Sequence, residues 1–165
     1  TDESAVTEPY HIKKLNACRI VCMEMDNAYR TLAEYRLLWK RFIHELTLAG
    51  VDTGRAEYVG VSLDDPQVTP RDKCCHLLGA TITPGGGPMK RFTEYIRPAG
   101  LYAIFRHTGG YHTLPELYSE IYGQWLPDSA YRPANTMSME VYVSMPLESD
   151  TEGIITEIYI TIEKK

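Results

Sequence analysis

The sequence lacks several features that would place it in a specialised class of protein. No apolar run approaches the roughly 20 residues that a membrane-spanning helix needs. The formal net charge is -5, which argues against non-specific binding of nucleic acid. Phe and Trp are scarce, with 3 and 2 copies, whereas Tyr occurs 12 times. Because tyrosine joins an apolar ring to a polar tip, this composition suits surfaces and pockets that are partly apolar and partly wet.

Cysteines are few and do not form a recognisable framework. They are Cys18, Cys22, Cys74 and Cys75. Adjacent cysteines have poor disulfide geometry, and although His76 follows them, no second pair with metal-ligand spacing converges on the same point. We therefore predict buried or reduced thiols in a cytoplasmic protein, with no metal site and no cofactor.

Motifs for catalysis are also missing. The segment 107–112 contains two glycines, but their spacing fits neither a dinucleotide-binding turn nor a P-loop, so we predict a simple turn. Ser129 lacks the motif of a nucleophile elbow. The residues alone therefore assign no catalytic group.

The order of predicted elements repeats once along the chain. Apolar residues at helical spacing predict a helix over residues 28–49, between a strand at 11–25 and two strands at 58–63 and 74–82. The run Thr83-Pro84-Gly85-Gly86-Gly87-Pro88 breaks the chain. The second half repeats the order with a strand at 92–107 interrupted near 98–100, a helix at 113–125 and strands at 139–143 and 157–162. Thr113 and Glu116 predict a capping box at the start of that helix, and Asp26 and Asn27 predict an N-cap for the first.

This repeat predicts a single α+β domain over residues 1–165, built from two β-α-β-β units in pseudo-twofold arrangement. The units are residues 11–83 and 89–165, and residues 1–10 form a polar lead-in. We expect an antiparallel sheet with two main helices on one side and a cleft between the halves. The chain starts at Thr1 and not at Met, so we expect that it was cut from a longer protein or lost a tag.

Glu140 is the most informative polar residue. Alternation along 138–143 places Glu140 and Tyr142 on one face of a strand and Met139, Val141 and Val143 on the other. A carboxylate buried there needs a partner. Gly60 occupies the equivalent position in the first half, so we expect a void opposite the carboxylate and a pocket that accepts a cation. The alternative is that Glu140 lies on a solvated sheet face.

Aromatic residues are concentrated in the second half. They form either an aromatic wall or ordinary packing, and for Phe105 and Trp125 we favour packing that also touches a pocket. The cluster is Tyr102, Phe105, Tyr111, Tyr118, Tyr122, Trp125, Tyr131 and Tyr142.

Five segments of the sequence together carry the pattern of a known family. The segments are Tyr102-Ala103-Ile104-Phe105-Arg106-His107-Thr108-Gly109-Gly110-Tyr111, Trp125-Leu126-Pro127-Asp128-Ser129-Ala130-Tyr131, Met139-Glu140-Val141-Tyr142-Val143, Thr156-Glu157-Ile158-Tyr159-Ile160-Thr161-Ile162 and Gly60-Val61-Ser62-Leu63-Asp64-Asp65-Pro66. In this order and spacing they resemble the GyrI-like small-molecule-binding domain. The resemblance covers about residues 11–164, and it departs from the family pattern at Ala130 and Gly110, neither of which we expect at the pocket.

The resemblance implies the same paired fold and a ligand cleft between the halves. It implies that a glutamate at the position of Glu140 meets lipophilic cations. Such domains occur in AraC-type activators, in multidrug-sensing regulators and as gyrase-inhibitory proteins. The ligand-binding residues that we expect here are Glu140, Tyr142, Trp125, Phe105, Gly60 and Tyr102.

We therefore expect the ligand-sensing domain of a bacterial transcription regulator, monomeric or dimeric, which contacts DNA only through a domain absent from this chain. Two alternatives stay open. One is a stand-alone protein that binds a protein partner such as gyrase. The other is a hydrolase of small electrophiles that uses Glu140 and Tyr142 as acid and base.

Overall fold

The computed structural model describes residues 7–25, 32–62, 76–82, 89–110, 113–144 and 154–165. These residues form one eight-stranded antiparallel sheet and its covering helices. The strands are β1 (His11–Leu15), β2 (Cys18–Met25), β3 (Tyr58–Ser62), β4 (His76–Ile82), β5 (Thr93–Arg97), β6 (Gly100–Thr108), β7 (Tyr131–Tyr142) and β8 (Ile155–Lys164). The helices are α1 (Leu32–Leu48), α2 (Leu114–Glu120), the π-helix η3 (Ile121–Trp125) and α3 (Leu126–Asp128).

The strand order β1-β6-β8-β7-β3-β4-β2-β5 has an internal symmetry. Exchanging β1 with β5, β2 with β6, β3 with β7 and β4 with β8 reproduces the same order read backwards. The centre of the sheet is the antiparallel pair β3 and β7, in which Gly60 lies directly opposite Glu140. The pseudo-twofold axis therefore passes through this residue pair. The predicted α+β fold with an antiparallel sheet and two main helices is confirmed.

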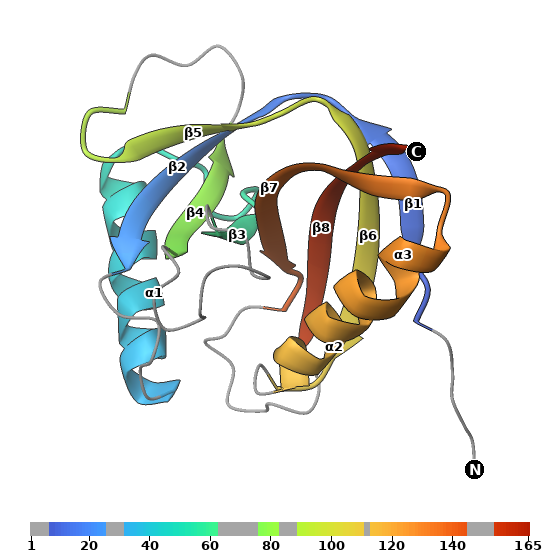
Figure 1. Cartoon of the computed structure of the whole chain (residues 1–165). Helices are drawn as coiled ribbons and strands as arrows, with labels where there is room; N and C mark the ends of the chain where they lie inside the picture. The colour runs from blue at the N-terminus through green and yellow to red at the C-terminus, as the bar shows by residue number, and fades with distance from the viewer. Residues whose placement is uncertain (1–6, 26–31, 63–75, 83–88, 111–112, 145–153) are drawn as a thin grey trace.

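The consecutive strands β1 and β2, and likewise β5 and β6, run from one end of the sheet to the other. β1 pairs with β6 and β2 pairs with β5, so both strand pairs arch across the top of the molecule in Figure 1. On the face of the sheet beneath these arches, the described residues form a core to which only strands contribute. It includes Ile20, Cys22, Val59, Tyr102, Met139 and Tyr159. Burial raises the pKa of the Cys22 thiol to about 12, which keeps it protonated near neutral pH.

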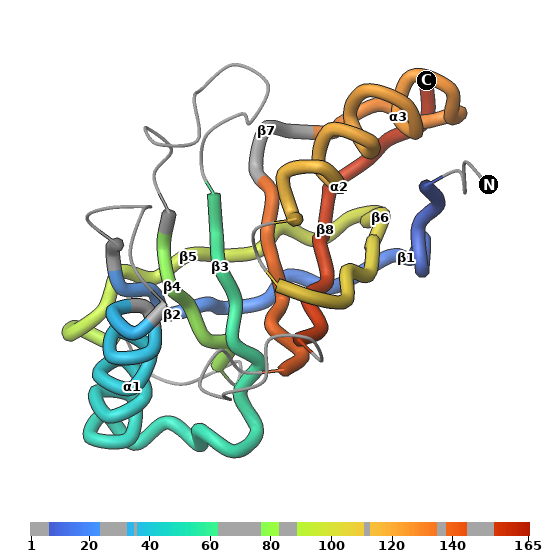
Figure 2. The backbone as a smooth tube through the Cα atoms, turned by 90° about the horizontal axis from the view of Figure 1, so that it is seen from below, coloured from blue at the N-terminus to red at the C-terminus, as the bar shows by residue number. Residues whose placement is uncertain are grey.

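The helices cover the opposite face, one on each half of the sheet (Figure 2). Trp39, Phe42 and Leu46 of α1 are fully buried against β2, β3 and β4. Their spacing of three and four is the helical stripe that the sequence predicted. On the other half, α2, η3 and α3 bury apolar residues against β6 and β8. The strip of sheet formed by β7 and β3 lies between the two helical layers.

Some local predictions differ from the structure. Thr113 forms no side-chain cap, because its hydroxyl donates to the carbonyl of Gly110 (3.0 Å) and lies 2.6 Å from His107 Nε2. The predicted capping box with Glu116 is therefore wrong. The second helical segment continues to Asp128 through a π-turn, and β7 starts earlier than predicted, at Tyr131. The predicted N-cap at 26–27 and the cysteines at 74–75 lie outside the described residues.

Among the described residues, no helix is long and apolar enough to cross a membrane. These residues also contain no group of three or more His, Cys, Asp or Glu side chains arranged to hold a metal ion.

Candidate functional site

Glu140 lies at the centre of the sheet, on the face that carries the helices. Its neighbours across the ladder are Gly60 on β3 and Ile158 on β8. The residue is half-buried. The strand places the carboxylate between the two helical layers, because α1 covers one half of the sheet and α2 the other. This position is half-way between a sealed core and an open sheet face, the two environments that the sequence left open.

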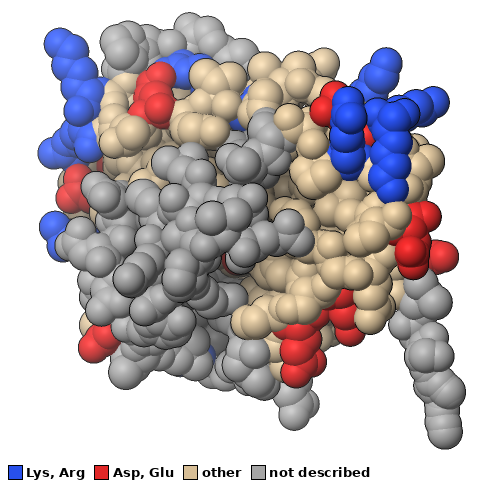
Figure 3. Space-filling view, viewed as in Figure 1, with Lys and Arg blue, Asp and Glu red and all other residues tan. Residues whose placement is uncertain are grey.

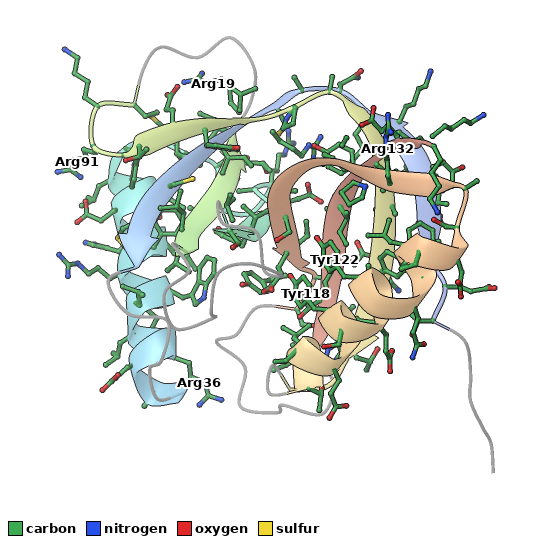
Figure 4. All side chains as sticks on the ribbon, in the orientation of Figure 1. Arg19, Arg36, Arg91, Tyr118, Tyr122 and Arg132 are labelled. Atoms are coloured by element: carbon green, nitrogen blue, oxygen red, sulfur yellow. The ribbon has the colours of Figure 1, made fainter. Side chains whose placement is uncertain are left out.

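Two tyrosine hydroxyls hold the Glu140 carboxylate. The Tyr142 hydroxyl donates to Oε1 at 3.0 Å, and the Tyr118 hydroxyl donates to Oε2 at 2.7 Å. Tyr118 comes from α2 and reaches from the helix toward the strands, with Tyr122 one turn further along on the same side (Figure 4). Both donors are neutral, so they orient the carboxylate and satisfy its lone pairs without cancelling its charge.

The space above Gly60 is occupied by the side chain of Tyr142. A Cβ atom at position 60 would meet the Tyr142 hydroxyl and would lie 3.2 Å from its Cζ. The same Tyr142 ring packs edge-on against Trp39 of α1, with ring centroids 5.5 Å apart. The void that the sequence predicted beside Glu140 is therefore filled by Tyr142, which Gly60 allows to lie flat across β3. Through Tyr142 and Tyr118, the carboxylate is connected to both helical layers.

Two glycines of neighbouring strands provide a matched test of this packing. A Cβ at Gly79 would lie 2.7 Å from Ile20 Cγ2 and 2.9 Å from Val59 Cγ2, both fully buried. We expect Gly79→Ala to lower the free energy of unfolding by about 1–3 kcal/mol, because branched core side chains cannot move away. We expect a smaller loss for Gly60→Ala, because its obstacle is the far end of one tyrosine. Urea unfolding of both variants measures the difference, and equal losses would contradict it.

Phe105 and Trp125 lie in the core under α2. Phe105 is buried, and its ring centroid is 5.1 Å from that of Trp125, which stacks on Tyr131 at 6.2 Å. In the sheet, Ile158 separates Phe105 from Glu140, since it pairs with both. The structure thus brings Phe105 and Trp125 together, one strand away from the carboxylate. Trp125 remains half-buried at the edge of this cluster.

Tyr102 does not join the other candidate residues. It is fully buried on the opposite face of the sheet, where its hydroxyl donates to the carbonyl of Pro98 at 2.8 Å. Burial raises the pKa of this hydroxyl to about 12. Because successive residues of a strand alternate in direction, Tyr102 and Phe105 of β6 point to opposite sides. Tyr102 is therefore a core residue beneath the β5–β6 arch.

Sequence reasoning missed the roles of two residues at this site. Trp39 was recognised only as part of a helical stripe, and nothing local in the sequence indicates that α1 meets Tyr142. Tyr118 was included in the aromatic cluster but was not assigned to Glu140. The spacing of Tyr118 and Tyr122, four residues apart on one helix, is the signal that would have marked a shared tyrosine face.

The described surface separates charges of opposite sign. In Figure 3 most Lys and Arg side chains lie at the upper corners, and acidic side chains lie along the lower edge and the right side. α2 itself carries the exposed Glu116 and Glu120. The direct contacts of the Glu140 carboxylate are aromatic, because both of its hydrogen-bond donors are tyrosines.

The chain was compared with known families and structures. A family model described as a GyrI-like small molecule binding domain matches residues 8–163. A DNA gyrase inhibitor of Yersinia enterocolitica is 34% identical over 107 residues, covering 64% of this chain and 57% of the inhibitor. This chain thus corresponds to little more than half of that relative.

Solved structures show the same fold at low sequence identity. EcmrR in a complex with DNA has a TM-score of 0.75 at 21% identity, over 94% of this chain and 57% of EcmrR. The isolated C-terminal domain of EcmrR has a TM-score of 0.72 at 18% identity, over 94% of this chain and 97% of that domain. SAV2435 bound to tetraphenylphosphonium has a TM-score of 0.59 at 15% identity, over 93% of each chain.

Proposed function

The chain belongs to the GyrI-like small-molecule-binding domain family, and on that basis we propose that it binds a hydrophobic cation at Glu140. The observation that carries this proposal is the half-buried carboxylate at the pseudo-twofold axis, held by two neutral tyrosine hydroxyls. A negative charge in an aromatic setting attracts a cation both through its charge and through the faces of the rings.

The hydrogen bonds favour one kind of cation. Each Glu140 oxygen already accepts a hydrogen bond, so a ligand need not donate one. A large cation without N–H groups loses little on leaving water, and it suits this carboxylate better than a strongly hydrated ammonium group. The likeness to SAV2435, solved with tetraphenylphosphonium, supports this choice.

We further propose that the domain senses this ligand for a transcription regulator. The likeness to the C-terminal domain of EcmrR, a protein solved with DNA, supports this role. DNA would be contacted by another domain, since the present fold corresponds to 57% of EcmrR. The ligand would act by binding one of two states more tightly. We also propose that the protein is cytoplasmic and is a monomer or a dimer. Each chain would form one domain of two repeated units, residues 11–83 and 89–165.

A binding experiment with a charged ligand and a neutral analogue tests the proposal. Tetraphenylphosphonium is titrated into the protein by calorimetry, with triphenylphosphine oxide as the uncharged control. We expect saturable binding of the cation with a rise in melting temperature, since a ligand specific for the native state stabilises it. We expect much weaker binding of the neutral analogue. Equal binding of both compounds, or no binding of the cation, would refute the proposal.

A second function has one observation in its favour. The relative named as a DNA gyrase inhibitor is 34% identical over 107 residues, so a protein partner such as gyrase is the alternative. Inhibition of supercoiling by the purified chain, with no response to tetraphenylphosphonium, would favour this alternative. Turnover of an electrophile that disappears in Glu140→Gln would instead favour a hydrolase.

A further inference from the structure

A pocket lies at the end of the sheet, where β2 begins and β4 ends. It has a volume of about 580 Å³, and its walls come from β2, the loop after α1, β4, the segment before β5 and Arg97 at the end of β5. None of its lining residues is Glu140 or a side chain that contacts it. Arg19 marks this region at the top of Figure 4.

Arg97 is the distinctive residue of this pocket. Its Nη2 donates to the carbonyl of Asn16 at 2.9 Å, and its guanidinium carbon lies 5.9 Å from the centre of the Tyr102 ring. Its Nε is buried without an acceptor, and no carboxylate of the described residues lies within ion-pair distance. An arginine has several more N–H donors than this one hydrogen bond uses. A half-buried cation with unused donors favours an anionic partner.

The other arginines of the pocket already have acidic partners. Arg19 pairs with Glu94, and Arg55 lies 3.6 Å from Asp52 at the exposed rim. Glu57 also lines the pocket. Burial is the main cause that raises the pKa of the half-buried Cys18 thiol; the charge of Arg97 lowers this pKa and the charge of Glu57 raises it. A second negative charge on a ligand would therefore be repelled by Glu57. One anionic group is the charge that the pocket accepts best.

The remaining walls are apolar. Val51, Ile82 and Met89 also line the pocket, and all three pack against the core under α1. Their side chains offer a surface for a short hydrocarbon, whose burial stabilises binding in proportion to its area.

We propose that this pocket binds a small aliphatic monocarboxylate. The carboxylate accepts hydrogen bonds from the free edge of the Arg97 guanidinium, and the hydrocarbon chain packs on Val51, Ile82 and Met89. Arginine suits this group because its planar donors match both carboxylate oxygens. The pocket contains none of the residues that hold Glu140. Arg97 and Tyr102 lie on the opposite face of the sheet from that carboxylate, whereas Val51, Ile82 and Met89 pack on the side of α1.

Isovalerate is the probe for this proposal, with isovaleramide as its neutral isostere and succinate as a dianion. Each is titrated into nitrogen-15-labelled protein and followed by two-dimensional NMR. We expect saturable shifts for isovalerate at the amides of Cys18, Val51 and Thr81 and at the Arg97 side-chain N–H. We expect weaker shifts for isovaleramide and succinate. Equal shifts with isovaleramide, unsaturable shifts, or shifts centred on Glu140 would overturn the proposal.

Variants of Arg97 provide the second arm of the experiment. We expect Arg97→Gln to weaken isovalerate at least about tenfold, the loss typical of a hydrogen bond to a charged group. Arg97→Lys keeps the charge without the planar donors, so we expect an intermediate affinity and a native fold. Arg91→Gln is the matched control, because Arg91 pairs with Glu45 outside the pocket. Unchanged affinity in both Arg97→Lys and Arg97→Gln would also overturn the proposal. If Arg97→Gln fails to fold, the NMR titration of the unmutated protein decides whether the proposal holds.

Discussion

Glu140→Gln is expected to weaken binding of tetraphenylphosphonium by about 100-fold, which corresponds to about 2.7 kcal/mol. Two unit charges about 4 Å apart attract by about 4 kcal/mol at an effective dielectric constant of about 20, and solvent at a half-buried position removes part of this energy. The amide has nearly the shape of the carboxylate and can still form hydrogen bonds with Tyr118 and Tyr142. The substitution therefore removes the charge with little change in packing. Calorimetric titration of the variant measures the loss.

Two controls distinguish the effect of the charge at Glu140 from the effect of the net charge of the protein. Glu163→Gln removes one negative charge at an exposed end of β8, where Glu163 lies 3.4 Å from Arg132. We expect this variant to bind the cation within about twofold of the unmutated protein, since exposed distant charges are screened by salt. The neutral triphenylphosphine oxide should bind equally to all three proteins. A Glu140→Gln variant with unchanged cation affinity would show that the carboxylate is not the binding group.

Trp39→Ala is expected to lower the free energy of unfolding by about 3–5 kcal/mol, the usual cost of truncating a buried Trp. Trp39 is fully buried and contacts the rings of Phe42, Tyr58 and Tyr142 edge-on, with centroids 6.0, 6.0 and 5.5 Å away. Each such pair adds about 0.5–1.5 kcal/mol beyond area burial. For a chain of 165 residues this corresponds to a fall in melting temperature of about 10 °C.

The same variant tests the connection between α1 and the site. Loss of the Trp39 ring leaves Tyr142 without its support, so we expect the cation affinity of Trp39→Ala to fall as well. Trp39→Phe keeps an aromatic ring and should lose about half as much stability. Leu37→Ala is the control on the same helix, because Leu37 is 66% exposed, and it should change stability by less than about 0.5 kcal/mol. Thermal and urea unfolding measure both effects, and a Trp39→Ala variant as stable as Leu37→Ala would contradict the expectation.

Periodicity in the sequence predicted most of the architecture. The spacing of Trp39, Phe42 and Leu46 predicted the buried face of α1, and alternation around Glu140 predicted that it shares one face of β7 with Tyr142. The comparison of the two halves placed Gly60 opposite Glu140, and the strand register has these residues paired. These predictions succeeded because local spacing decides which face of an element is apolar.

The contents of the site were harder to predict, because they depend on contacts between distant segments. Tyr118 reaches Glu140 across 22 positions of the chain, and Trp39 reaches Tyr142 from the other half of the fold. The sequence grouped Tyr102 with the other tyrosines of the second half. In the structure its position in β6 places it on the face of the sheet away from Glu140. The failed capping box has a local cause, since Thr113 bonds to Gly110 in place of the helix backbone.

The pairing of Gly60 with Glu140 also limits how a repeated unit can build such a site. A residue on a twofold axis meets its own counterpart, so two identical halves would set two glutamates face to face, with Cα atoms about 5 Å apart. Neighbouring carboxylates at that distance repel each other, and one of them would have to take up a proton. Two identical halves would therefore place either two repelling charges or one protonated carboxyl group at the centre. Because Gly60 stands opposite Glu140, the fold has a single carboxylate at its centre, where strict duplication would place two carboxyl groups.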